Sequence, residues 1–138
     1  QHKFEISHRS KKAEEKIIKS WIEKFSIKNS GPDATIKSLS GGNQQKVVIA
    51  RCLQTNPKIL ILDEATRGVD LGAKAEIYEI LRNLANEGLS ILVVSSEIGE
   101  IFEISDRILV MHAGEISANL DRSKTNEAEV VAAATGVK

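Results

Sequence analysis

The stretch from Leu39 to Asp70 constrains this chain most, because it places polar groups at the ends of two apolar elements. It opens with Ser40-Gly41-Gly42 in front of a long apolar helical run, and serine is a good N-cap residue for a helix. The two glycines leave the N–H groups of the first turn uncovered by side chains, so an oxyanion could approach the positive end of this helix. We therefore predict a phosphate-binding turn at Ser40, Gly41 and Gly42.

A second polar group follows the four branched apolar residues of 59–62, which predict a buried strand. This strand delivers Asp63 and Glu64 to its carboxyl end, where open α/β sheets place their ligands. Such an end can hold a metal ion and a general base. Each group alone also has an ordinary explanation, since Ser-Gly-Gly is often only a helix cap and two acids after a strand are often only a solvated edge.

Taken together, these segments resemble three motifs of the nucleotide-binding domains of ABC transporters. Leu39-Ser40-Gly41-Gly42-Asn43-Gln44-Gln45-Lys46 resembles the signature motif, Ile59-Leu60-Ile61-Leu62-Asp63-Glu64 the Walker B motif, and Thr66-Arg67-Gly68-Val69-Asp70 the D-loop. The Asn-Gln-Gln-Lys ending and the segment Gly72-Ala73-Lys74-Ala75-Glu76-Ile77 are most similar to the second ATPase domain of bacterial sugar importers of the ribose, galactose and xylose type. The resemblance covers nearly the whole chain.

The apolar spacing predicts an α/β fold. We expect helices over about 10–25, 41–53, 71–86 and 126–136, a short helix that begins near Ile98, and strands at 59–62, 91–94, 108–111 and 116–120. The last two strands should form a hairpin at Ala113-Gly114, and the alternation favours a mainly parallel sheet with flanking helices. The resemblance implies the distal part of a P-loop NTPase (ABC ATPase) domain. In it, residues 1–56 would form part of the helical subdomain with the signature helix, and residues 57–138 the core with Walker B, D-loop, switch loop and C-terminal helix.

Composition narrows the function classes. The 138 residues are 41% hydrophobic, and the 19 basic residues cancel the 19 acidic ones, which argues against nucleic-acid binding. No apolar stretch approaches the roughly 20 residues needed to span a bilayer. The lone Cys52 is expected to be a small buried hydrophobe, and residues 1–9, with His2 and His8, a mobile lead-in.

The chain contains no Gly-x-x-x-x-Gly-Lys-Ser/Thr phosphate loop and begins with Gln1. We therefore expect it to be the distal fragment of a longer protein. Its strands should then lack part of their apolar cover, and the fragment alone should dimerise or exchange elements.

The resemblance assigns roles to individual residues, with ATP and Mg²⁺ as cofactors. Glu64 would polarise the attacking water as general base, and Asp63 would hold Mg²⁺ through water. Ser40, Gly41 and Gly42 would contact the γ-phosphate of a nucleotide held by a different domain. Asn43, where many members carry Gln, would lie near the ribose. Asp70 matches the D-loop acid that links the two sites, and a plain helix N-cap explains it nearly as well.

Two departures from the family pattern stand in the site region. Ala65 occupies the position where proline is usual, which loosens the turn after Glu64. Ser96 occupies the position of the switch histidine that contacts the γ-phosphate, and a hydroxyl cannot carry the positive charge of an imidazolium. We expect His112 to be a solvated turn residue rather than a substitute for that histidine.

The resemblance implies an ATP-hydrolysing subunit that energises monosaccharide import from the cytoplasmic face of the inner membrane. Its partners would be a first ATPase domain or second copy with a Walker A motif, the membrane subunits and, indirectly, a periplasmic or extracellular sugar-binding protein. The fragment alone should be inactive. Two alternatives are the carboxyl-terminal half of a chromosome-maintenance or DNA-repair ATPase and a non-catalytic nucleotide-sensing module. The former has long coiled-coil heptads upstream of its signature, and the helix expected over 10–25 is too short for that.

Overall fold

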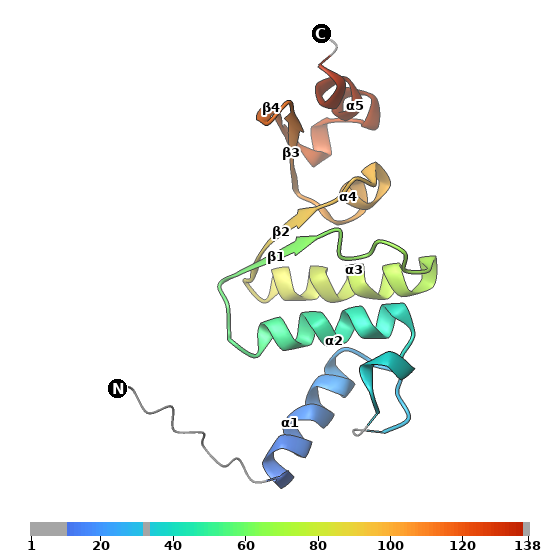
Figure 1. Cartoon of the computed structure of the whole chain (residues 1–138). Helices are drawn as coiled ribbons and strands as arrows, with labels where there is room; N and C mark the ends of the chain where they lie inside the picture. Colours follow the sequence, from blue (N-terminus) through green and yellow to red (C-terminus); the bar gives the residue numbers. More distant parts are fainter. Residues whose placement is uncertain (1–10, 32–33, 137–138) are drawn as a thin grey trace, which may run out of the picture. The chain divides into compact units, whose positions relative to one another are not determined.

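The computed structural model describes residues 11–31 and 34–136 (Figure 1). Its elements, in chain order, are α1 (Lys11–Lys24), the 3₁₀ helix η1 (Ile36–Ser38), α2 (Gly41–Leu53), β1 (Ile59–Asp63), α3 (Leu71–Asn86), β2 (Ser90–Val94), α4 (Ile98–Ile104), β3 (Arg107–His112), β4 (Glu115–Asp121), the 3₁₀ helix η2 (Arg122–Lys124) and α5 (Glu127–Thr135). These elements confirm the predicted α/β class. The lead-in predicted for residues 1–9 lies outside the described residues.

The chain divides into two units. The first holds the residues up to Pro57 together with Gly68–Ile77, and the second holds Lys58–Arg67 with the residues from Tyr78 onward. Helix α3 therefore gives its first turns to the first unit and its remainder to the second. The assignment of residues 1–56 to a helical subdomain and of 57–138 to an ATPase core stays a prediction.

In the first unit, an aromatic pair lies at the end of α1, with Phe25 directly after the last helical residue. The Trp21 and Phe25 rings stack with their centroids 5.5 Å apart and an interplanar angle of 7°, and Phe25 is 1% exposed. Stacking of this kind stabilises the packing beyond what the buried apolar area alone contributes. Trp21 thus serves as a packing anchor through its contact with the buried Phe25.

Helix α2 has the predicted bounds, and although its apolar residues extend almost all round the helix, only one side of it is buried. Its buried residues follow one stripe at helical spacing, namely Gly42, Lys46, Ile49 and Ala50. On the other side Val48 is 46% exposed, and Cys52 is exposed rather than buried as predicted. Apolar side chains extend round more of the helix surface than the neighbouring elements of this unit cover.

In the second unit, β1 and β2 pair in parallel, with Ile59 opposite Ser90 and Asp63 opposite Val94. Strand β1 is buried on one face only, because Leu60 and Leu62 point inward while Ile61 is 65% exposed. Two of its three outward side chains, Ile59 and Ile61, are apolar, which is what a strand face without a covering element shows. Parallel pairing in this chain is confined, among the described residues, to these two strands.

The second sheet is the predicted hairpin, in which β3 and β4 pair antiparallel. Ala113 and Gly114 both have positive φ, 50° and 85°, as the two central residues of a tight hairpin turn require. The core of this part consists of Ile108, Val110 and Val130, against which pack Ile101, Phe102, Ala118, Leu120 and Ala133. Helix α5 is therefore held on the hairpin by apolar contacts.

Local signals define the ends of α3 and α5. Gly88, with φ 97°, follows the end of α3, and the N–H groups of Gly88 and Leu89 donate to the carbonyls of Ala85 and Leu84. Asn126 caps α5 by accepting from the N–H of Glu129 at 3.1 Å. Glu129 bonds back to the side chain of Asn126 instead of its backbone N–H, so the capping box at this helix end is only half formed.

Candidate functional site

Ser40 stands at the N-cap of α2, but its hydroxyl does not cap the helix as predicted. Its backbone is extended, with φ −62° and ψ 156°, and its side chain makes no cap hydrogen bond. The hydroxyl instead accepts from the Nδ2 of Asn43 at 2.8 Å. The side chain of Ser40 therefore does not bond to the N–H groups of the first turn, and these groups remain available to another acceptor. A helix end that binds an anion needs this arrangement.

Asn43 connects the first turn of α2 to the loop after α1. Its Oδ1 accepts from the backbone N–H of Lys28 at 2.9 Å, while its Nδ2 donates to Ser40. Both the oxygen and the nitrogen of this half-buried amide thus have a partner within the chain. In this state Asn43 orders the turn formed by Ser40, Gly41 and Gly42, which we call the signature turn.

The two glycines of the signature turn differ in their surroundings. A Cβ at Gly41 would have nothing within 4 Å, whereas a Cβ at Gly42 would collide with the Cβ of Ala73 on α3. Gly42 is therefore required for the close approach of two helices, a packing role that the sequence did not reveal. Gly41 is exposed and has no such restriction.

Asp70 is the N-cap of α3, as one of its two predicted roles requires. Its Oδ1 accepts from the N–H of Ala73 at 3.0 Å, and its carbonyl accepts from the N–H of Lys74 at 2.9 Å. Ala73 is the residue that meets Gly42, so the cap and the glycine contact lie in the same turn of α3. The role of Asp70 as a link between two nucleotide sites stays a prediction.

Asp63 and Glu64 end β1 in different conformations. Asp63 is the last residue of the strand and is exposed. Glu64 adopts a left-handed backbone with φ 48°, a conformation that costs a non-glycine residue about 1–3 kcal/mol unless its surroundings fix it. Two backbone bonds do so, since Glu64 donates to the carbonyl of Val94 at 2.8 Å and accepts from the N–H of Arg67 at 3.1 Å.

The side chain of Glu64 reaches the loop after β2. Its Oε1 accepts from the backbone N–H of Ser96 at 2.8 Å. The structure thus brings together two residues that the sequence assigned to one site, although the contact uses the main chain of Ser96 and not its hydroxyl. A carboxylate has further lone pairs, so the bond orients Glu64 without saturating it.

A buried pair next to this contact escaped the sequence reasoning. Thr66 and Glu100 are 2% and 6% exposed, and the Oγ1 of Thr66 donates to the Oε1 of Glu100 at 2.5 Å. This length lies in the range of hydrogen bonds to a carboxylate. The available signal in the sequence was Glu100, which lies four residues before Ile104 and therefore on the same face of this short helix. The pair ties the loop after β1 to α4, two residues beyond Glu64.

His112, predicted to be a solvated turn residue, is exposed but makes a specific contact. Its Nδ1 lies 2.8 Å from the carbonyl oxygen of Ala134, near the end of α5. Gly136 follows with φ 72° and packs close to the imidazole ring. His112 thus helps fix the end of α5 on the hairpin.

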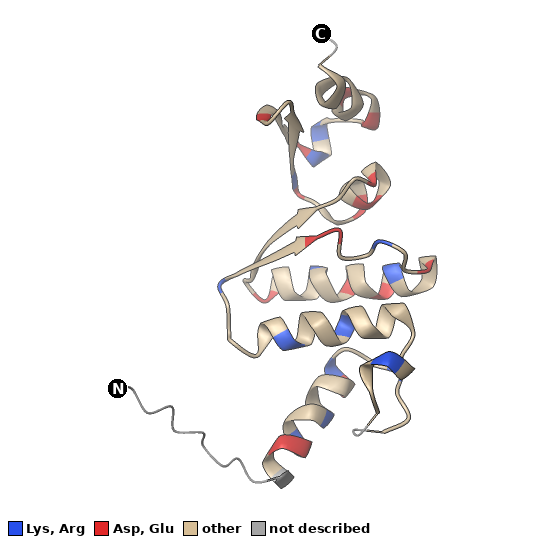
Figure 2. Ribbon diagram, viewed as in Figure 1, with Lys and Arg blue, Asp and Glu red and all other residues tan. Residues whose placement is uncertain are grey.

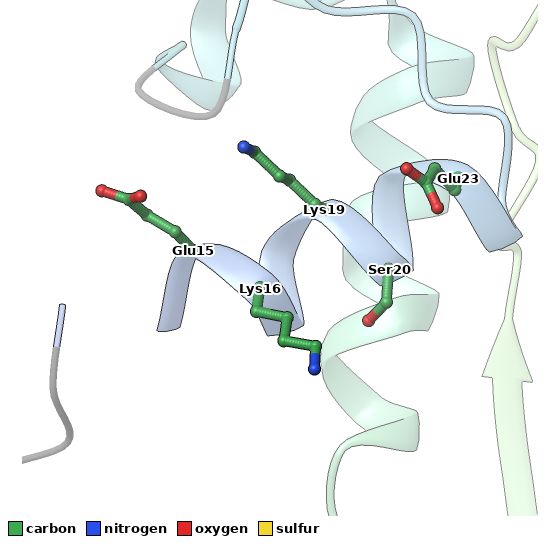
Figure 3. A pocket seen from close by; sticks show the side chains of 5 residues that line it. All are labelled: Glu15, Lys16, Lys19, Ser20 and Glu23. Atoms are coloured by element: carbon green, nitrogen blue, oxygen red, sulfur yellow. The ribbon is translucent and has the colours of Figure 1, made fainter. Parts of the chain in front are cut away.

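The described residues show no further site of a recognisable kind. Basic and acidic residues are interspersed along the elements (Figure 2), and no three His, Cys, Asp or Glu side chains in the described part could together hold a metal ion. A depression along α1 is lined by charged and polar side chains of that one helix, which point in several directions (Figure 3). None of the described helices is long and apolar enough to cross a membrane.

Comparison with known proteins gives consistent matches. A family model described as ABC transporter matches residues 1–67. The xylose import ATP-binding protein XylG of Escherichia coli (strain K12) is 49% identical over 94% of this chain, and the ribose import ATP-binding protein RbsA of Caldanaerobacter subterraneus subsp. tengcongensis is 50% identical over 89%. The chain spans 25% of the length of each of these relatives.

Solved structures agree with the sequence matches. The dimeric structure of MJ0796, a bacterial ABC transporter cassette, superimposes with a TM-score of 0.70 and 26% identity, covering 83% of this chain and 49% of that one. An inward-facing putative metal-chelate type ABC transporter gives a TM-score of 0.75 at 19% identity over 93% of this chain and 51% of that one, which supports the fold alone. The motifs, the sequence identity and the fold lead to one conclusion: this chain belongs to the ATP-binding domains of ABC transporters.

Proposed function

We propose that this chain is part of the ATP-binding subunit of an ABC importer that couples ATP hydrolysis to monosaccharide uptake. The observation that carries the proposal is the 49% identity over 94% of the chain to a xylose import ATP-binding protein. The ribose import relative at 50% identity supports the same substrate class. ATP, the sugar and the partners all belong to this proposal, since the chain spans a quarter of those proteins.

The signature turn would contact the γ-phosphate of a nucleotide held by another domain. Its backbone N–H groups stand at the positive end of a 13-residue helix, and Ser40 leaves them uncapped. The bonds of Asn43 to Ser40 and to Lys28 hold this turn in place before any ligand arrives. Donors that are fixed in advance stabilise developing charge without reorganisation, which is the main source of catalysis in phosphoryl transfer.

Mg²⁺ would be held at Asp63 through water. One exposed carboxylate at the end of a strand fits this ion, because Mg²⁺ keeps several waters and binds through one or two carboxylates together with substrate phosphates. The described residues offer no all-protein cage, which agrees with a site completed by nucleotide. When bound, the ion would neutralise phosphate charge.

Glu64 would orient and polarise the attacking water. Its hydrogen bond to the N–H of Ser96 fixes one carboxylate oxygen, so the other can accept from a water molecule. Ser96 stands where the family has a histidine, and its hydroxyl can offer a hydrogen bond to phosphate but no positive charge. This site would therefore hydrolyse ATP more slowly than one with the histidine, and the main contribution of the chain would be its signature turn.

The proposed function also implies the partners of this chain. The nucleotide facing the signature turn would be held by a first ATPase domain or a second copy, consistent with the dimeric cassette among the similar structures. Membrane subunits would carry the sugar, and a sugar-binding protein would deliver it to them. The subunit would then lie peripherally on the cytoplasmic face of the inner membrane.

The test is reconstitution of the full-length protein with its membrane subunits in lipid vesicles. ATP hydrolysis that rises when the sugar-loaded binding protein is added, together with sugar uptake, supports the proposal. Tight ATP binding without hydrolysis under these conditions would instead identify a nucleotide-sensing module. Hydrolysis that responds to DNA and not to sugar would point to a DNA-repair type of ATPase.

A further inference from the structure

We propose that Lys46 and Glu76 form a positioning ion pair that holds the signature turn of α2 against the first turns of α3. Neither residue is one of the motif residues given a role above. The inference rests on the proposed function and deepens it, since it names the residues that place the phosphate-facing turn.

Lys46 is an unusual residue for the interior of the first unit. Its side chain is 1% exposed, and it lies in the buried stripe of α2 with Gly42, Ile49 and Ala50. The Nζ donates to the Oε2 of Glu76 at 2.6 Å and to the carbonyl of Ser26 at 3.3 Å. A buried ammonium group is tolerated only with such partners, and of these two Glu76 is the one that supplies the compensating charge.

Glu76 joins three segments. Its second oxygen, Oε1, lies 3.8 Å from the Nζ of Lys28, whose backbone N–H donates to Asn43. Asn43 in turn donates to Ser40. The hydrogen bond from Lys46, followed by its positive charge, lowers the pKa of Glu76 below its ordinary value, in keeping with an ionised acid at this junction. Glu76 is therefore connected to the middle of α2 through Lys46, and to the start of α2 through Lys28 and Asn43.

The pair fixes a register between two helices. Gly42 meets Ala73 about one turn before Lys46 meets Glu76, so α2 and the first turns of α3 run side by side in the same direction (Figure 1). The glycine contact sets how closely the helices approach. The ion pair sets how far one can slide or rotate along the other, because Lys46 has its carboxylate partner in this one register. Asp70 caps α3 at the same end, so the ion pair and the glycine contact hold the signature turn beside Asp70 and the first turn of α3.

The test uses the full-length protein with its membrane subunits and four variants. Glu76→Gln removes the acid charge but keeps an acceptor, Lys46→Met removes the cation, and Lys46→Arg keeps it. Glu79→Gln is the matched control, because Glu79 is also an exposed acid and lies about one turn further along the same helix. We expect Glu76→Gln and Lys46→Met to lower kcat for ATP hydrolysis by about 10-fold or more, as misplacement of a positioning group does. Their KM for ATP should change less than about 2-fold, because another domain holds the nucleotide. Lys46→Arg and Glu79→Gln should keep most of the wild-type rate.

A second measurement does not depend on activity. Hydrogen exchange of the amides in residues 41–50 should become faster in Glu76→Gln than in Glu79→Gln, while exchange in β3 and β4 stays equal. If Glu76→Gln leaves both kcat and this exchange unchanged, the positioning role is refuted. Should Lys46→Met fail to fold, Glu76→Gln and Lys46→Arg decide the matter. A wild-type protein that hydrolyses no ATP would overturn the proposed function, and the exchange data would still accept or reject the ion pair.

Discussion

Replacing Gly41 by Asp tests whether the signature turn faces a phosphate. Gly41 is the first residue of α2, it is exposed, and a Cβ there would meet nothing within 4 Å. The substitution therefore adds a carboxylate without a steric cost. Gly42 is unsuitable for this purpose, because any side chain there would collide with Ala73 and a loss of function could reflect packing alone.

The electrostatic penalty can be estimated. A carboxylate about 4 Å from a phosphate oxygen repels it by roughly 4 kcal/mol per unit charge at the effective dielectric constant of a protein surface. That corresponds to a rate loss of about 10³-fold, and exposure of residue 41 to solvent reduces it to about 10²-fold. In the absence of nucleotide the sign is reversed, since an acid in the first turn of a helix stabilises it by about 0.3–1 kcal/mol. We therefore expect a variant that is at least as stable as wild type and nearly inactive.

The assay is steady-state ATP hydrolysis by the full-length protein with its membrane subunits, accompanied by thermal melting of each variant. Gly41→Asn is the matched control, because it has the shape of Asp without the charge. Gly42→Ala is the packing control, and we expect it to lose about 1–3 kcal/mol of stability through overpacking against Ala73. If Gly41→Asp retains more than half of the activity of Gly41→Asn, the turn does not face phosphate in the working site and the reasoning is wrong.

Three further predictions concern other parts of the chain. Glu64→Gln in the full-length protein should slow turnover less than the same change in the Walker B motif of the first domain, because the site of Glu64 has Ser96 in the switch position; equal losses of kcat would contradict this. Thr66→Val should lower the free energy of unfolding in urea by about 1–3 kcal/mol by leaving the buried Glu100 carboxylate without its donor, and Thr66→Ser should restore most of it. Because the pKa of Glu76 is lowered from 4.5, its stabilising effect should be complete above pH 4.5 and fade as the pH falls below that value. The difference in melting temperature between wild type and Glu76→Gln should therefore shrink on acidification through this range, and a difference that grows would refute the assignment.

The sequence predicted those features that depend on residues near one another in the chain. The bounds of α2, the capping of α3 by Asp70 and the hairpin turn at Ala113-Gly114 all follow from local chemistry, and each is present. The apolar runs likewise located every strand. Local preference decides such features because the competing conformations leave polar backbone groups without partners.

The features that the sequence did not predict depend on what each side chain meets across the fold. Val48 and Cys52 are apolar but exposed, since the neighbours of α2 reach only one side of it. Lys46 is charged but buried, because Glu76, thirty positions later, provides its partner. Its place in the stripe of Gly42, Ile49 and Ala50 was the one available hint. In the same way the hydroxyl of Ser40 accepts from the side chain of Asn43 instead of capping α2, a competition that propensity cannot resolve.

The signature turn shows how a motif can combine two physical requirements in adjacent residues. Gly41 has open space around it, so no contact within the described chain requires glycine there, whereas Gly42 is required by the approach of Ala73. Ser40 and Asn43 are bonded to each other, and Asn43 is bonded to the main chain of Lys28, so the backbone of the turn is ordered without nucleotide. Preorganisation of this kind removes the entropy cost of ordering donors during catalysis. Ser40, Gly42 and Asn43 thus position the turn, and the uncapped N–H groups of the first turn remain available to bind phosphate.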